Sequence, residues 1–173
     1  MKSLTIRLFV VLTAVMATAS AEFHDEWKNA FDRVWLGEAY WANPMEDWHL
    51  EAGRAVCLGG ANRNVALLTH AVDASGGAFT MRVKLGLSVA GEGSAGFRVG
   101  IQDEIDDYRA AALRGKGINM GVTHDGRLFV GDVSTRLIST PLDRGVVLVL
   151  AGESVAEGYR LILRAEGQAG ALL

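Results

Sequence analysis

The sequence is poor in cysteine and proline and has no excess of positive charge. Cys57 is its single cysteine, which excludes a scaffold held together by disulfide bonds within the chain. Lys and Arg number 17 against 20 Asp and Glu, so the net charge is −3, which excludes a strongly basic nucleic-acid binder. Two prolines and 50% hydrophobic residues exclude a disordered chain. Glycine is abundant, at 21 of 173 residues, and indicates many tight turns.

Long hydrophobic runs are also missing. A bilayer span requires about 20 apolar residues, and no apolar run in the sequence reaches that length. The apolar run 8–17 follows Lys2 and Arg7 and precedes Ala19-Ser20-Ala21, the small residues that a signal peptidase accepts. Residues 1–21 are therefore predicted to be a cleaved signal peptide, with an uncleaved anchor as the alternative. We expect the remaining chain of about 150 residues to be one domain, exported to the periplasm or cell exterior and not membrane-bound.

Residues 22–41 have a different pattern from the rest of the mature chain. Phe23, Trp27, Phe31 and Trp35 recur at every fourth position, with charged residues between them. This spacing places apolar side chains on one face of a helix. We therefore predict a short, amphipathic helical segment that leans on the following domain.

Residues 42–173 are dominated by a period of two, which is typical of strands with one buried face. The clearest strand is 78–87, and Asp125-Gly126 is a strong hairpin signal. Another strand is expected at 108–113, and the glycines around Phe97 and Ile101 predict a close backbone approach or a bulge. Strands recur about every 8–12 residues, so an all-β antiparallel sandwich or barrel is predicted.

The last residues, Ala171-Leu172-Leu173, begin another apolar strand where the sequence stops. A natural terminus seldom falls two or three residues into such a strand. We therefore expect the sequence to be truncated at its C-terminal end, with a short last strand as the alternative.

Several short motifs in this region resemble a known family. They are Asp47-Trp48, Arg63-Asn64-Val65, Gly96-Phe97-Arg98-Val99-Gly100, Asp107-Tyr108-Arg109-Ala110-Ala111, Arg114-Gly115-Lys116-Gly117 and Asp125-Gly126-Arg127-Leu128-Phe129. Over residues 40–164 they resemble the concanavalin A-like jelly-roll domains of exported bacterial proteins. More narrowly, they are similar to the sandwich domain that precedes the catalytic domain of alkaline phosphatase D-type metallophosphoesterases. The resemblance implies a jelly-roll β-sandwich and a downstream catalytic domain as a partner.

Catalytic chemistry has little support in the sequence. The four histidines (His24, His49, His70 and His124) are scattered, so no metal site or other cofactor is predicted. A structural calcium occurs in some jelly rolls, but no residues for one can be assigned. Glu104-Ile105-Asp106 resembles the start of the motif of laminarinase-type glycoside hydrolases, in which alternate carboxylates face one cleft. The second Glu of that motif is missing, because Tyr108 occupies its position.

Aromatic residues favour a binding role instead. Trp27, Trp35, Trp41 and Trp48 fall within one short window, and tryptophan rings can stack on sugars. The candidate ligand-binding residues are Trp41, Trp48, Arg63, Asn64, Arg98 and Arg109. The sequence therefore predicts a non-catalytic accessory module that binds a glycan or another extracellular polymer. The alternatives are a glycoside hydrolase using Glu104 and Asp106, and a ligand-free structural module in which all four tryptophans are buried.

Overall fold

The computed structural model describes residues 22–60, 62–72, 77–89, 91–102, 109–110, 116–135 and 142–166. Within these ranges the regular structure is almost entirely antiparallel β-strand, so the all-β prediction is confirmed. The predicted signal peptide at 1–21, Glu104-Ile105-Asp106 and the predicted last strand at 171–173 lie outside the described residues.

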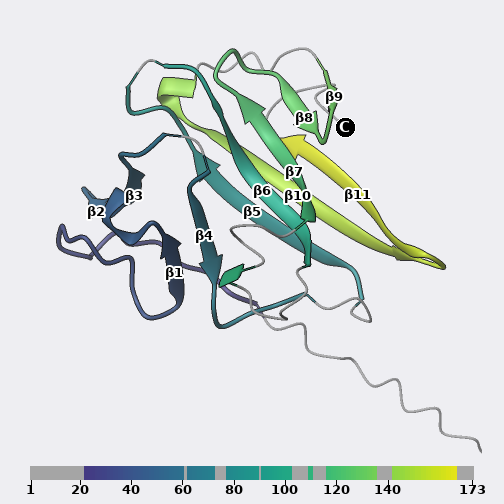
Figure 1. Cartoon of the computed structure of the whole chain (residues 1–173), viewed down its shortest axis with the longest axis horizontal. Helices are drawn as coiled ribbons and strands as arrows, with labels where there is room; N and C mark the ends of the chain where they lie inside the picture. The colour runs from purple at the N-terminus through teal and green to yellow at the C-terminus, as the bar shows by residue number, and fades with distance from the viewer. Residues whose placement is uncertain are drawn as a thin grey trace, which may run out of the picture.

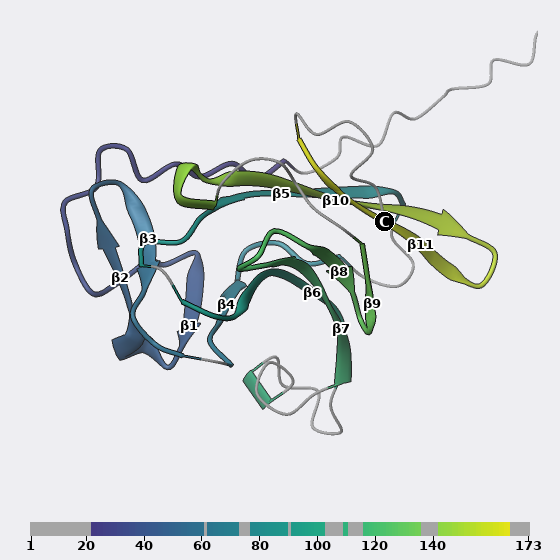
Figure 2. The same ribbon diagram turned by 90° about the horizontal axis from the view of Figure 1, so that it is seen from above.

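Two antiparallel sheets form the main body and pack face to face (Figures 1 and 2). One sheet has the order β11-β10-β5 and the other has the order β6-β7-β8-β9. The first contains β5 (Phe79–Leu85), β10 (Val146–Val155) and β11 (Gly158–Ala165). The second contains β6 (Ser94–Gln102), β7 (Lys116–Thr123), β8 (Leu128–Val130) and β9 (Val133–Ser134).

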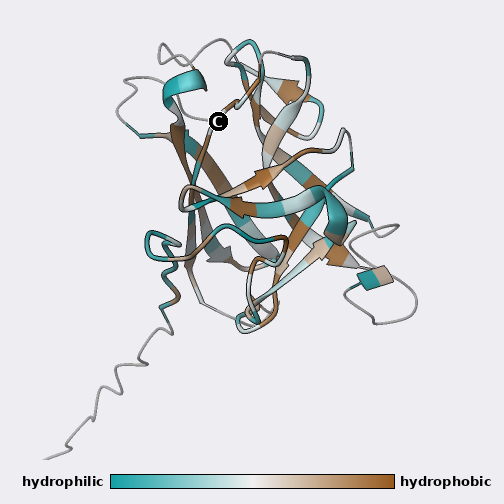
Figure 3. Ribbon diagram, turned by 90° about the vertical axis from the view of Figure 1, so that its left-hand side faces the viewer, coloured by the Kyte–Doolittle hydropathy of each residue, from teal (hydrophilic) through white to brown (hydrophobic). Residues whose placement is uncertain are grey.

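The core lies between these sheets and is built from alternate residues of their strands. Met120 of β7 and Leu148 and Leu150 of β10 are fully buried and belong to one hydrophobic cluster. Figure 3 shows that the hydrophobic residues are concentrated on the strands. The predicted strand 78–87 is confirmed as β5, and Val83 and Leu85 pack against this cluster while Arg82 and Lys84 are exposed.

A smaller lobe precedes the sandwich and contains two antiparallel ribbons of two strands each (Figure 1). In one, β1 (Tyr40–Asn43) pairs with β4 (Asn64–Leu67), and in the other β2 (Trp48–Glu51) pairs with β3 (Arg54–Cys57). The 3-10 turn η1 (Met45–Asp47) connects β1 to β2, and a second one, η2 (Leu142–Arg144), precedes β10. Leu36, Ala42 and Leu50 are buried in this lobe and form a second hydrophobic cluster.

The hairpin between β7 and β8 is formed at Asp125-Gly126, as predicted. Gly126 has φ of 84°, a left-handed value that glycine adopts without steric cost. Thr123 Oγ1 donates a hydrogen bond to Asp125 at 2.5 Å, and Arg127 Nε donates one at 2.8 Å. Because both bonds favour the charged carboxylate, they lower the pKa of Asp125 to about 2.

Two features of the glycines in β6 also agree with the prediction of a bulge or a close backbone approach. Gly100 has φ of 65°, and the register with β7 shifts between Val99 and Gln102, which is the predicted bulge. Gly96 is directly opposite Gly121 on β7, and a Cβ on Gly121 would overlap the carbonyl oxygen of Ala95. The two strands thus approach too closely for any side chain at this pair. Such glycine pairs permit a sharp bend, and Figure 2 shows that β6 and β7 are strongly bowed.

The predicted helical segment at 22–41 is wrong. These residues form turns and extended chain, ending in the start of β1. Arg33 exchanges two backbone hydrogen bonds with Leu50, at 3.1 and 2.6 Å, which fixes an extended conformation. The aromatic residues also do not share one buried face, because Trp27 packs on the second hydrophobic cluster while Phe31 is 75% exposed. Pairing with β2 therefore outweighs the helical spacing.

Two other strand predictions need correction. Arg109 and Ala110 are the only described residues of the predicted strand 108–113, and they are helical. The sequence also predicts strands at 146–150 and 159–163 divided by a loop rich in Gly, Glu and Ser, but this loop is strand, because β10 continues to Val155 and pairs with β11 as far as Gly158. Glu153 and Arg160 face each other in this extension, with 3.4 Å between carboxylate and guanidinium. This pairing lets two polar stretches continue as a ribbon.

Candidate ligand-binding site

The structure places the six predicted binding residues in different parts of the molecule. Trp41 and Asn64 lie on the β1–β4 ribbon, whereas Arg98 lies on β6 in the sandwich. Arg109 is exposed in a helical turn. Trp48 and Arg63 lie in the small lobe. Four of the candidate residues therefore lie in the small lobe, and Arg98 and Arg109 lie elsewhere, so the six do not form one site.

Trp48 and Arg63 both have structural contacts in the small lobe. Trp48 packs against the second hydrophobic cluster and is directly opposite Cys57 on β3. Arg63 Nε donates a hydrogen bond to Asp47 Oδ2 at 2.6 Å, and both side chains are partly buried. This ion pair connects the end of η1 to the residue that precedes β4. Both residues thus have contacts that stabilise the lobe.

The outer face of the β6–β9 sheet is the first candidate surface. Phe97 and Met120 are opposite each other and belong to the core, so the next residues along, Arg98 and Asn119, point to the other face. The middle of this sheet lies nearest the β11-β10-β5 sheet and its ends curve away, so its outer face is concave (Figure 2). Arg98 and Asn119 are therefore opposite each other on the concave surface.

The side chain of Arg98 lies against Gly117 of β7, which is two residues from Asn119 and has no side chain. A Cβ on Gly117 would be only 3.1 Å from Arg98 Nε and 3.4 Å from its Cγ. Asn119 is exposed beside it, and Gly96 and Gly121 continue the same face. Gly96 and Gly117 are exposed whereas Gly121 is buried, so the floor that a ligand can approach lies at Gly96 and Gly117.

Phe129 of β8 completes the concave face. It is opposite Gly121 on one side and Ser134 on the other, and it is partly exposed. An arginine supplies several hydrogen-bond donors in a fixed plane, and an asparagine amide both donates and accepts. A phenylalanine ring adds an apolar contact. This combination suits a flat, hydroxyl-rich molecule.

Asn119 and Phe129 were not among the residues predicted from the sequence. A signal for Asn119 exists in Gly117-x-Asn119-x-Gly121, where alternate residues with little or no side chain flank a polar one. Such a pattern marks a strand face that carries no hydrophobic core. Phe129 lacks a comparable signal, because it sits between Leu128 and Val130 in an apolar run.

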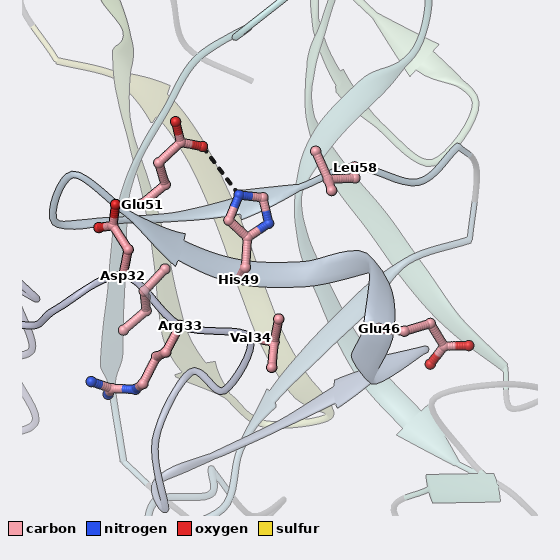
Figure 4. A pocket seen from close by; sticks show the side chains of 8 residues that line it. Asp32, Arg33, Val34, Glu46, His49, Glu51 and Leu58 are labelled. Atoms are coloured by element: carbon pink, nitrogen blue, oxygen red, sulfur yellow. Dashed lines mark hydrogen bonds and ion pairs between the residues drawn. The ribbon is translucent and has the colours of Figure 1, made fainter.

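A hollow of about 390 Å³ lies beside β2 in the small lobe (Figure 4). His49 is at its centre, and its Nε2 lies 3.1 Å from a carboxylate oxygen of Glu51. Val34 and Leu58 form apolar walls, and Asp32 accepts a hydrogen bond from the backbone of Ala52 at 2.9 Å. The residues lining this hollow include no Ser, Thr or Cys, so none of them supplies a hydroxyl or thiol nucleophile beside His49.

Metal binding and membrane spanning find no support in the described part of the chain. There, no three His, Cys, Asp or Glu side chains are grouped so that they could hold a metal ion. No helix within the same ranges is long and apolar enough to cross a membrane. Glu104 and Asp106, the carboxylates of the glycoside hydrolase alternative, lie outside these ranges.

Comparison with protein-family models finds no match for the chain, and searches among curated proteins and among solved structures find none either. The chemistry of the concave face is therefore the main evidence for function.

Proposed function

We propose that this chain is an exported, non-catalytic β-sandwich module that binds a glycan on the concave face of the β6–β9 sheet. The observation that carries the proposal is the arrangement of Arg98 and Asn119 over a floor of glycines, with Phe129 beside them. Pyranose sugars are flat and covered with hydroxyl groups. A low surface with planar donors, an amide and one aromatic ring is complementary to them.

The exposure of the tryptophans argues against a module in which all four rings serve only the core. A structural module would bury all four rings, but Trp35 is 52% exposed and Trp27, Trp41 and Trp48 are only partly buried. The two-sheet architecture is compatible with a jelly roll of the concanavalin A-like type. In the proposed whole protein the module is an accessory to a downstream hydrolase that resembles alkaline phosphatase D.

Binding to neutral polysaccharides tests this proposal. Calorimetric titrations would use laminarin, arabinoxylan and galactomannan, and the tightest-binding of the three would then be titrated into Arg98→Ala. We expect a loss of affinity of about tenfold or more, since hydrogen bonds from charged groups typically contribute about 1.5–3 kcal/mol. Asn119→Ala, at an exposed position, should weaken binding in the same direction without disturbing the fold.

The matched control is Arg160→Ala. Arg160 lies on β11, in the other sheet, and its side chain is exposed. The Arg160→Ala variant should bind the polysaccharide as tightly as the unmodified protein does. The proposal is wrong if none of the three polysaccharides binds, or if Arg98→Ala and Asn119→Ala both bind as tightly as the control.

A further inference from the structure

We infer that the β1–β4 ribbon forms a second contact site for neutral sugars, on a different hydrogen-bonded sheet from the concave face. This inference rests on the proposed function, because it assumes the same class of ligand. The site consists of Trp41, Asn43, Asn64 and Ala66, which we call the ribbon site. Only Trp41 and Asn64 could be suspected from the sequence, and their relation to Asn43 and Ala66 follows from the strand pairing.

The register of the ribbon brings these residues onto one face. Trp41 is directly opposite Ala66, and Asn43 is directly opposite Asn64. Residues that are opposite in an antiparallel pair share a face, as do residues two apart on one strand. The four side chains therefore form a block two residues long and two strands wide. Neighbours in such a block are about 5–7 Å apart, a distance that one sugar ring can span.

The burial of the ribbon indicates which face is available. Tyr40 and Ala42, on the opposite face, pack in the cluster around Leu50. Trp41, Asn43, Asn64 and Ala66 are all partly exposed. Tyr40 and Ala42 thus anchor one face of the ribbon, although Val65 of that face is 38% exposed, and the other face carries a partly exposed indole ring and two partly exposed amides.

The composition of the ribbon site selects the ligand. The indole offers an apolar face for the C–H groups of a pyranose, and its cross-strand neighbour Ala66 carries only a methyl group. An asparagine amide carries both a carbonyl acceptor and N–H donors, a combination that matches neighbouring hydroxyl groups, although Asn64 Nδ2 already donates to Asn62 within the chain. None of the four side chains is charged, so a neutral sugar is favoured over an acidic one.

The local backbone also supports the position of Asn64. Its Nδ2 donates a hydrogen bond to the carbonyl oxygen of Asn62 at 3.5 Å, and Asn62 has φ of 65° in the loop before β4. This contact orients the amide plane relative to the ribbon. An oriented amide loses less conformational entropy on binding than a freely rotating one.

Two contact sites on one chain predict that long polymers bind more tightly than short oligosaccharides. When one site holds a polymer, the other meets the same molecule at a high effective concentration, so the overall affinity exceeds that of either site. A tetrasaccharide has far fewer sugar rings than the polymer with which to contact both sites. Removing the ribbon site should therefore weaken polymer binding and reduce the difference between polymer and tetrasaccharide.

The test compares Trp41→Ala with Trp35→Ala, a tryptophan replaced elsewhere in the same lobe. Each variant is titrated with the tightest-binding of laminarin, arabinoxylan and galactomannan and with its tetrasaccharide, following tryptophan fluorescence and heat. We expect Trp41→Ala to weaken polymer binding about tenfold or more, and Trp35→Ala to leave it unchanged. Asn43→Ala keeps the indole and should give a smaller loss of affinity in the same direction. It tests the ribbon site independently if Trp41→Ala does not fold.

The outcomes separate this inference from the proposed function. If Arg98→Ala loses binding while Trp41→Ala and Asn43→Ala bind the polymer as the unmodified protein does, the ribbon site is refuted and the proposed function stands. If the unmodified protein binds none of the three polysaccharides, the proposed function itself fails. Equal loss in Trp35→Ala and Trp41→Ala would also refute the inference, because the effect would not be specific to the ribbon.

Discussion

Gly121→Ala is expected to destabilise the protein by about 3 kcal/mol, at the upper end of the usual range for overpacking. The new Cβ would overlap the carbonyl oxygen of Ala95 and lie 2.8 Å from the Cα of Gly96. Both are backbone atoms of the paired strand, so no side-chain rotation can relieve the overlap. The strands β6 and β7 would have to separate at their bend. Urea unfolding followed by circular dichroism measures the change.

Gly60→Ala is the matched control for this substitution. Gly60 is exposed between β3 and β4, no atom lies within 4 Å of its added Cβ, and its φ is not left-handed. Its unfolding midpoint should remain within the error of the unmodified protein. A Gly121→Ala protein as stable as this control would show that β6 and β7 do not approach as closely as described.

Leu150→Ala is expected to lower the free energy of unfolding by about 2–5 kcal/mol. Leu150 is fully buried in the centre of β10, opposite Met81 on one side and Leu163 on the other. Removing three carbons there leaves a cavity between the sheets that the surrounding strands cannot fill. The same urea titration measures the loss, and the slope of the transition should not change.

Val155→Ala provides the comparison on the same strand. Val155 is 43% exposed near the end of β10, so truncation removes little buried surface, and we expect less than about 1 kcal/mol. Comparable losses in the two variants would contradict a core centred between the sheets at Leu150.

Local signals in the sequence were sufficient to place several of the strands. The alternation at 79–85 and the Asp125-Gly126 turn identify β5 and the β7–β8 hairpin, because period and turn conformation depend on neighbouring residues. The spacing of Phe23, Trp27, Phe31 and Trp35 failed for the opposite reason. Backbone pairing of Arg33 with Leu50 is a tertiary effect, and no local pattern reveals it.

The candidate surfaces were harder to predict than the strands. Residue type pointed to Trp41, Asn64 and Arg98, but the sequence does not indicate which of them share a face. Asn43 and Asn64 are brought together by the register of β1 and β4, and Arg98 reaches Asn119 through that of β6 and β7. The Gly96–Gly121 pair, which permits the bend, is likewise formed by residues that are distant in sequence.

The most direct test of the proposed glycan site is a map of amide chemical shifts during titration with a tetrasaccharide. The tetrasaccharide is that of the tightest-binding neutral polysaccharide, and it is added to the protein labelled with ¹⁵N. Binding on the concave face predicts the largest shifts at Gly96, Gly117, Asn119 and Gly121. Shifts confined to the outer face of the other sheet, around Arg82 and Arg164, would contradict the account.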